Sequence, residues 1–395
     1  MKAYNSNILF NTSVKRKAEN WLAQKLITEE QFISISNYYN TYSYTPNIFV
    51  RIGLFIFTCF IVLASLGMYF LLFSSGFNTG SGFYEITSLL YAIACFTALE
   101  LLIRKKQVYK AGSDDALLYV GLISISLFIF SLMSSFETDS PIVFFSSLLP
   151  ILFAACVRYA DRLVTFAVTV CMYAIVFLIV QNLCGTFAKL IMPFAFMAFS
   201  AFLFFQLHYL HRKERMHYWH SCLALAKFVA LLILYASGNY YIIRESGEEF
   251  FDLHLLPGQD IPLAVFFYVF TAVVPFIYVY LGLKNKDKIL LWAGLLVFAA
   301  GAITFKYYFS MGHPEITLTL GGALLILIAY FSIQYFKKPR HGISFEEEQD
   351  ADSFLKTNAE ALIIMEGLKQ ESPAIQNDFK FGGGQSGGAG SGGSF

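Results

Sequence analysis

Long apolar segments recur along most of this chain, and no other feature limits its fold as strongly. A helix needs about 17 to 25 apolar residues to cross the hydrocarbon of a bilayer, because lipid offers no partner to an unpaired backbone group. About ten segments reach that length. They cover residues 52–73, 86–103, 116–136, 141–157, 163–183, 190–207, 219–242, 261–283, 289–305 and 316–336. The sequence therefore predicts an all-α polytopic transmembrane helical bundle.

The composition agrees with a membrane protein. Hydrophobic residues make up 57% of the sequence and charged residues only 14%, whereas soluble domains carry about 25% charged residues. A water-soluble globular domain is therefore excluded. The net charge of +1 gives no sign of a nucleic-acid partner.

Lys and Arg in the short loops predict the orientation, since positive charges are retained on the cytoplasmic side of a membrane. They gather before the first span and after every second span, for example at Lys15, Arg51, Arg104, Lys105, Arg158, Arg162, Arg212, Lys213, Lys284, Lys286, Lys337 and Lys338. The loops between these positions carry at most one or two cations. This alternation predicts an even number of spans with both termini in the cytoplasm.

The distribution of polar residues predicts four parts. Residues 1–47 form a cytoplasmic helical hairpin, and residues 48–337 form the ten-span transmembrane domain. Residues 338–381 form a cytoplasmic amphipathic helix. Residues 382–395 form a Gly-rich disordered tail, because Gly and Ser bury too little apolar surface to offset the entropy of ordering.

The N-terminal hairpin carries two recognisable signals. Thr28 and Gln31 fit a capping box, in which each side chain bonds the backbone N–H of the other residue. The surrounding stretch, from Trp21 through Leu26 and Ile27 to Tyr38, resembles the N-terminal hairpin of a family of predicted bacterial membrane proteins of unknown function. The resemblance covers this hairpin and the many-span layout. It implies a bacterial cytoplasmic-membrane protein, and it supplies no catalytic residues.

The cysteines suggest neither a disulfide framework nor a zinc site. All of them lie in or beside apolar segments without paired spacing, at Cys59, Cys95, Cys156, Cys171, Cys184 and Cys222. We expect them to be small hydrophobic side chains packed between helices.

Histidines cluster after the sixth predicted span. His208, His211, His217 and His220 are spaced symmetrically about Glu214. A hairpin turning there places His208 opposite His220 and His211 opposite His217, which is a possible site for Zn or Fe. The alternative is a basic loop that faces lipid headgroups, since the same turn carries several Arg and Lys residues.

Two ionisable residues fall inside predicted spans, where a charge is costly and often functional. They are Glu100 in the second span and Lys227 in the seventh. Glu100 can pair with Arg104 one turn later, and Lys227 can extend its ammonium to the interface. A Glu100–Lys227 pair, or a proton or substrate site, is the alternative.

The sequence favours a non-enzymatic scaffold or assembly component, because nucleophile elbows, phosphate loops and other catalytic motifs are missing from it. The alternative is a secondary transporter or lipid-handling protein that uses Glu100 or Lys227. The sequence indicates no discontinuous span, which counts against a carrier. A metal-dependent membrane enzyme is least favoured. The expected partners are the lipid bilayer and a protein bound to the cytoplasmic ends, with no cofactor.

The scaffold hypothesis predicts that deletion of residues 382–395 releases a protein partner. Proteins that co-purify with the full chain in mild detergent should be lost from the truncated chain, as mass spectrometry of both preparations would detect. Identical co-purifying proteins would contradict a partner-binding tail.

Overall fold

The computed structural model describes residues 3–4, 6–23, 25–39, 46–73, 81–106, 108, 110–137, 140–251 and 260–308, together with residues 326, 330 and 334. Throughout this part the chain is helical and has no β-strand, so the predicted all-α class is confirmed. The predicted cytoplasmic helix at 338–381 and the predicted tail at 382–395 lie outside the described residues. So does nearly all of the predicted span at 316–336.

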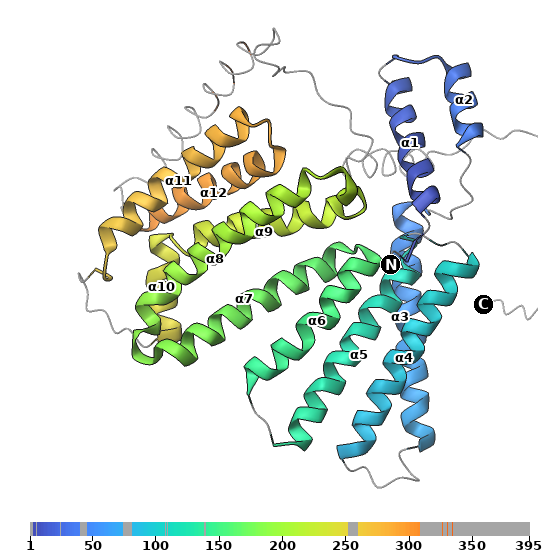
Figure 1. The fold of residues 1–395 in the computed structure, drawn as a ribbon, viewed down its shortest axis with the longest axis horizontal. Helices are drawn as coiled ribbons and strands as arrows, with labels where there is room; N and C mark the ends of the chain where they lie inside the picture. The colour runs from blue at the N-terminus through green and yellow to red at the C-terminus, as the bar shows by residue number, and fades with distance from the viewer. Residues whose placement is uncertain are drawn as a thin grey trace, which may run out of the picture.

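The N-terminal hairpin consists of α1 (Ser6–Ala23) and α2 (Glu29–Tyr38). The predicted capping box at the start of α2 is confirmed. Thr28 Oγ1 accepts a hydrogen bond from the Gln31 backbone at 3.3 Å, and Gln31 Oε1 accepts one from the Thr28 backbone at 2.9 Å. Figure 1 shows the hairpin standing beyond the end of the bundle at which α3 begins.

The first membrane group contains five apolar helices: α3 (Ile48–Phe73), α4 (Ser81–Lys106), α5 (Ser113–Ser135), α6 (Pro141–Tyr159) and α7 (Arg162–Cys184). Within it, α5 packs against both α3 and α4, and α6 packs against α7. Their buried side chains, which include Leu99, Leu118, Leu152 and Val164, form one hydrophobic core. Short turns between antiparallel neighbours explain this arrangement.

The second membrane group contains α8 (Ala188–His211), α9 (His220–Ala236), α10 (Tyr240–Phe251), α11 (Ala264–Lys284) and α12 (Lys288–Tyr308). Helix α9 packs against α8 and α12, and α11 packs against α12. Gly282 permits the α11–α12 approach, because a Cβ at this position would lie 2.8 Å from the backbone nitrogen of Leu291. Helix α7 contacts α8 and α9 and so joins the two groups.

Within the described residues, seven helices are long and apolar enough to span a membrane. They correspond to the first six predicted spans and the eighth. The seventh and ninth predicted spans contain shorter apolar helices, His220–Ala236 and Lys288–Thr304. The chain is therefore a multi-pass membrane protein by the length and composition of its helices. The predicted count of about ten spans is not confirmed.

The seventh predicted span, at 219–242, is not one continuous helix. Helix α9 ends at Ala236, and α10 begins at Tyr240 in a different direction, as Figure 1 shows. Asn239 begins the second helix by accepting a hydrogen bond from the Ile242 backbone at 3.2 Å, while the Tyr240 backbone donates to Thr271 Oγ1 at 3.0 Å. Side chains thus replace the helical hydrogen bonds lost at the break.

Gly238 makes the break possible by its lack of a side chain. A Cβ on Gly238 would overlap the ring of Phe270, whereas a Cβ on Gly67 of α3 would meet nothing within 4 Å. Asn239 and Tyr240 beside it are almost completely buried. The helix predicted over 219–242 therefore ends at Ala236. The sequence analysis missed this break because its signal is a small residue and local side-chain bonds rather than a proline.

We predict that Gly238→Ala lowers the free energy of unfolding by about 1–3 kcal/mol through overpacking against Phe270. Gly67→Ala is the matched control and should be neutral or stabilising by up to about 1 kcal/mol, since Ala favours a helix over Gly. Thermal unfolding of both variants in detergent would measure the difference. Equal melting temperatures would contradict the close packing at the break.

Candidate functional site

Glu100 lies in α4 and is bound by cations of its own helix group. Its Oε1 atom accepts hydrogen bonds from Arg158 Nε at 2.7 Å and from Tyr159 OH at 2.8 Å. Arg104, the partner expected from the sequence, lies at 3.6 Å from Oε2. Glu100 thus connects α4 to the end of α6. It lies in the first group of helices, whereas Lys227 lies in the second.

Lys227 lies in α9 and is buried, with 1% of its side chain exposed. Its ammonium extends to a charged turn at the ends of two helices, and whether this turn lies at the membrane interface stays a prediction. It forms an ion pair with the carboxylate of Asp287, in the turn between α11 and α12, and lies 5.6 Å from the centre of the Phe204 ring. A buried charge is tolerated only when a partner compensates it.

Asp287 is a site residue that the sequence analysis missed. Its Oδ1 atom accepts hydrogen bonds from the backbone of Ile289 at 3.1 Å and of Leu290 at 3.4 Å, so Asp287 also caps the start of α12. The signal available in the sequence was an acidic residue two positions before the apolar run that begins at Ile289, which is typical of a helix N-cap.

The pKa of Asp287 is set by competing effects. Burial acts to raise this pKa, but the Lys227 ammonium and the two backbone N–H groups outweigh burial and hold the pKa below its ordinary value. A carboxyl group with a lowered pKa in the folded state contributes stability above its unfolded pKa, and this is lost as the pH falls through its folded pKa. The Asp287 contacts therefore stabilise the protein at neutral pH and are lost in acid.

Two histidines of α8 border this ion pair. His208 Nδ1 lies 3.7 Å from Asp287 Oδ2, and the His208 ring stacks on Phe204. The ring of His211 stacks on that of His220 with centroids 3.7 Å apart. Within the described residues, the Nδ1 atoms of His208 and His211 are buried without a hydrogen-bond partner. We call Lys227, Asp287, His208, His211 and His220 the Lys227 cluster.

The predicted pairing of the histidines is wrong for His211, which faces His220. The turn contains a short 3₁₀ helix, Glu214–Trp219, so it is not a symmetric hairpin about Glu214. The side chain of His217 lies outside the described part of the structure. Among the residues that are described, no group of three or more His, Cys, Asp or Glu side chains is placed to hold a metal ion.

The alternative in which Glu100 pairs with Lys227 is also wrong, because each has another partner. The structure instead places Lys227 beside the histidine cluster, with Asp287 between them. Three of the four predicted histidines and one of the two predicted ionisable residues thus belong to one site.

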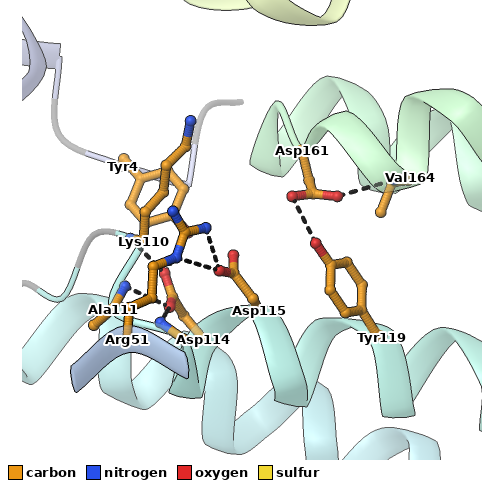
Figure 2. A network of polar contacts seen from close by, with 10 residues as sticks. Tyr4, Arg51, Lys110, Ala111, Asp114, Asp115, Tyr119, Asp161 and Val164 are labelled. Carbon is orange, nitrogen blue, oxygen red and sulfur yellow. Dashed lines mark hydrogen bonds and ion pairs between the residues drawn. The ribbon is translucent and has the colours of Figure 1, made fainter. Parts of the chain in front are cut away.

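A second polar network holds the start of α5, and Figure 2 shows its side chains. Asp114 is buried and accepts four hydrogen bonds. Its Oδ1 atom accepts from the backbone of Ala111 at 3.0 Å and of Gly112 at 3.1 Å. Its Oδ2 atom accepts from the backbone of Lys110 at 2.8 Å and from Tyr4 OH at 3.1 Å. Burial and the neighbouring Asp114 carboxylate raise the pKa of Tyr4. Tyr4 therefore stays protonated and able to donate.

The rest of this network joins two more helices, α3 and α7, to α5. Arg51 of α3 binds Asp115 Oδ2 at 2.6 Å, and Tyr119 OH donates to Asp161 Oδ2 at 3.0 Å. Asp161 also caps α7 by accepting from the Val164 backbone at 2.9 Å (Figure 2). The sequence analysis missed these acidic residues, although each precedes or begins an apolar run. Their complete pairing indicates a role in fixing helix ends.

A third group of polar side chains surrounds the α9–α10 break. Asn239 Nδ2 donates to Tyr235 OH and to Thr304 Oγ1, both at 3.0 Å. Thr271 Oγ1 donates to the Phe267 carbonyl at 2.7 Å. We call Tyr235, Asn239, Thr271 and Thr304 the break cluster. All four are buried and uncharged, and they connect α9, α11 and α12.

Helix α9 thus carries two unusual features. Its first half presents a buried ammonium to the Lys227 cluster, and its end forms the break cluster. Buried ionisable residues and interrupted helices are both typical of membrane proteins that move ions or solutes.

Comparison with protein-family models, with curated proteins and with solved structures found no match to this chain. The class that the fold defines is therefore the broad one: a multi-pass helical membrane protein. The resemblance of the N-terminal hairpin to a bacterial membrane family stays a prediction.

We predict that the Lys227–Asp287 pair behaves as a unit. Lys227→Met leaves a buried, unpaired carboxylate and should lower the free energy of unfolding by about 3–5 kcal/mol. Asp287→Asn keeps the cap of α12 and should be destabilising because Lys227 then lacks its counter-charge. The double variant should recover most of the lost stability in thermal unfolding. Additive losses would contradict direct pairing.

Proposed function

We propose that this membrane protein is a proton-coupled secondary carrier of the bacterial cytoplasmic membrane, with both termini in the cytoplasm. The observation that supports a carrier is the buried Lys227–Asp287 pair on a helix that is interrupted at Ser237–Asn239. A purely structural helix gains little from either feature, because a buried ion pair is commonly no more stabilising than apolar residues of the same volume.

In this proposal the Lys227 cluster is the site of the exchanging proton. Asp287 accepts the proton when a helix movement separates it from Lys227, because the intact pair keeps the Asp287 pKa below its ordinary value. Asp287 contacts both Lys227 and the backbone of α12, so its protonation alters two elements together. A proton on Asp287 leaves the Lys227 ammonium without its counter-charge. An anion can then take the place of the lost carboxylate charge. Its binding restores the electrical neutrality of the Lys227 cluster in the protein interior, where a net charge is costly.

The charge balance of the site favours an anionic solute. Lys227 and Arg212 lie near His208 and His211, and Asp287 is the acidic group that faces them. Protonation of Asp287 would leave this region net positive. A small carboxylate or phosphate therefore fits the site better than a cation.

The break cluster supplies the point at which α9 and α10 can change their relative direction. Carriers commonly use interrupted helices in this way, because side chains at the interruption keep the backbone satisfied in lipid. Thr304 of α12 and Thr271 of α11 bind the break, so a change there would reach the helices on either side of Asp287.

Proteoliposomes that contain a pH-sensitive dye provide the test. An inward gradient of a transported anion, drawn from a panel of small carboxylates and inorganic phosphate, should acidify the lumen. The Lys227→Met/Asp287→Asn double variant should fold but transport at least about tenfold more slowly. Glu100→Gln is the matched control outside the cluster and should keep its flux.

If no anion in the panel causes the wild-type protein to move protons, proton–anion coupling is contradicted. Equal flux in wild-type and double-variant proteoliposomes would remove the Lys227 cluster from the mechanism.

A second candidate function is the scaffold role that the sequence favours. The observation behind it is that α1, α2 and their connection expose several large apolar side chains, namely Phe10, Trp21, Leu26, Ile33 and Tyr38. Such side chains are typical of contact surfaces. A scaffold would retain its protein partners in the double variant, which lacks the charges of the proposed carrier.

A further inference from the structure

Two cysteines that are distant in the sequence meet at the junction of the two helix groups. Cys156 belongs to the last turn of α6, and Cys222 belongs to the first turn of α9. The start of α7 lies between them. The sequence analysis treated both as small hydrophobic side chains, because their separation along the chain matches no disulfide or metal motif.

The side chains around the start of α7 bring the two sulfur atoms together. Cys156 Sγ lies 3.2 Å from Thr165 Oγ1, and Cys222 Sγ donates to the Asp161 carbonyl at 3.5 Å. Thr165 Oγ1 donates to the same carbonyl at 2.7 Å. The two thiols thus contact the same hydrogen-bonded pair of groups, the Thr165 hydroxyl and the Asp161 carbonyl, from α6 and from α9.

Hydrogen bonds outside the thiol pair also join its two helices. Trp219 Nε1 donates to the Val157 carbonyl at 2.9 Å, and Tyr218 OH donates to the Arg158 carbonyl at 3.0 Å. These bonds join the residues before α9 to the end of α6. The two cysteines are therefore held beside each other by contacts that do not involve sulfur.

We propose that Cys156 and Cys222 form a redox-sensitive thiol pair, which a low-molecular-weight disulfide converts into an intramolecular disulfide bond. Cys156 is partly exposed, whereas 3% of Cys222 is exposed. Cys156 is therefore the thiol that reacts first, and Cys222 is the resolving thiol.

The exchange balances in two steps. The Cys156 thiol loses its proton and attacks one sulfur of the reagent, which forms a mixed disulfide and releases one reagent thiol. The Cys222 thiol then loses its proton, attacks Cys156 Sγ and releases the second reagent thiol. The protein loses two electrons and two protons, and the reagent gains both.

The resulting bond would join α6 of the first group to α9 of the second. Helix α9 also carries Lys227, so the disulfide would limit movement of the helix that the carrier proposal depends on. Formation of the bond itself needs no transport, and it can be tested whatever the solute is.

Oxidised glutathione is the probe for the test, applied to the full chain in detergent and in membranes. Remaining thiols are then blocked with N-ethylmaleimide, and peptides are identified by mass spectrometry. We expect a linked peptide pair that contains Cys156 and Cys222, a loss of two blocked thiols per chain, and reversal by dithiothreitol.

Three variants control the assignment. Cys156→Ser and Cys222→Ser should each abolish the linked pair. Cys184→Ser, at the other end of α7, should leave it unchanged. If a serine variant folds poorly, the linked peptide from the natural sequence still decides the outcome. The proposal would be overturned if Cys156 and Cys222 were both recovered in blocked form after oxidation. Linkage of either one to a different cysteine would also overturn it.

Discussion

Compensation of buried polar groups is the constraint on which the rest of this structure depends. Apolar surroundings leave an unpaired charge or backbone group without water, at a cost of several kcal/mol. Asp114 meets this constraint with four donors, and Asp287 meets it with Lys227 and two backbone N–H groups. Apolar side chains cover the helices, but these few polar residues decide which helix ends meet and in what register.

Much of the fold could be predicted because hydrophobic length and helix caps are local properties. The apolar runs located the membrane helices, and Thr28 with Gln31 located the start of α2. The interruption after Ala236 could not be predicted in this way. It depends on Gly238 packing against Phe270 and on Asn239 reaching Thr304, and both contacts join residues far apart in the sequence.

The candidate site was predictable only in part for the same reason. Lys227 and the histidines stood out because charges are rare in apolar segments, and this rarity is visible without a structure. Their common partner did not stand out, since Asp287 lies in a charged turn and resembles an ordinary helix cap. Likewise, Glu100 had several possible cations, and only the tertiary fold, which brings the end of α6 to Glu100, selects Arg158.

The contacts of the first described residues also bear on how the chain is made. The hydrogen bond from Tyr4 to Asp114 joins positions 110 residues apart, and the Ala3 backbone donates to the carbonyl of Arg158. A ribosome delivers residues 3 and 4 long before α5 and α6 exist, and domains generally form as the chain emerges. The N-terminal segment must therefore wait undocked until α6 has been inserted, so its attachment is a late event in biogenesis and reports that the chain is assembled as far as the end of α6.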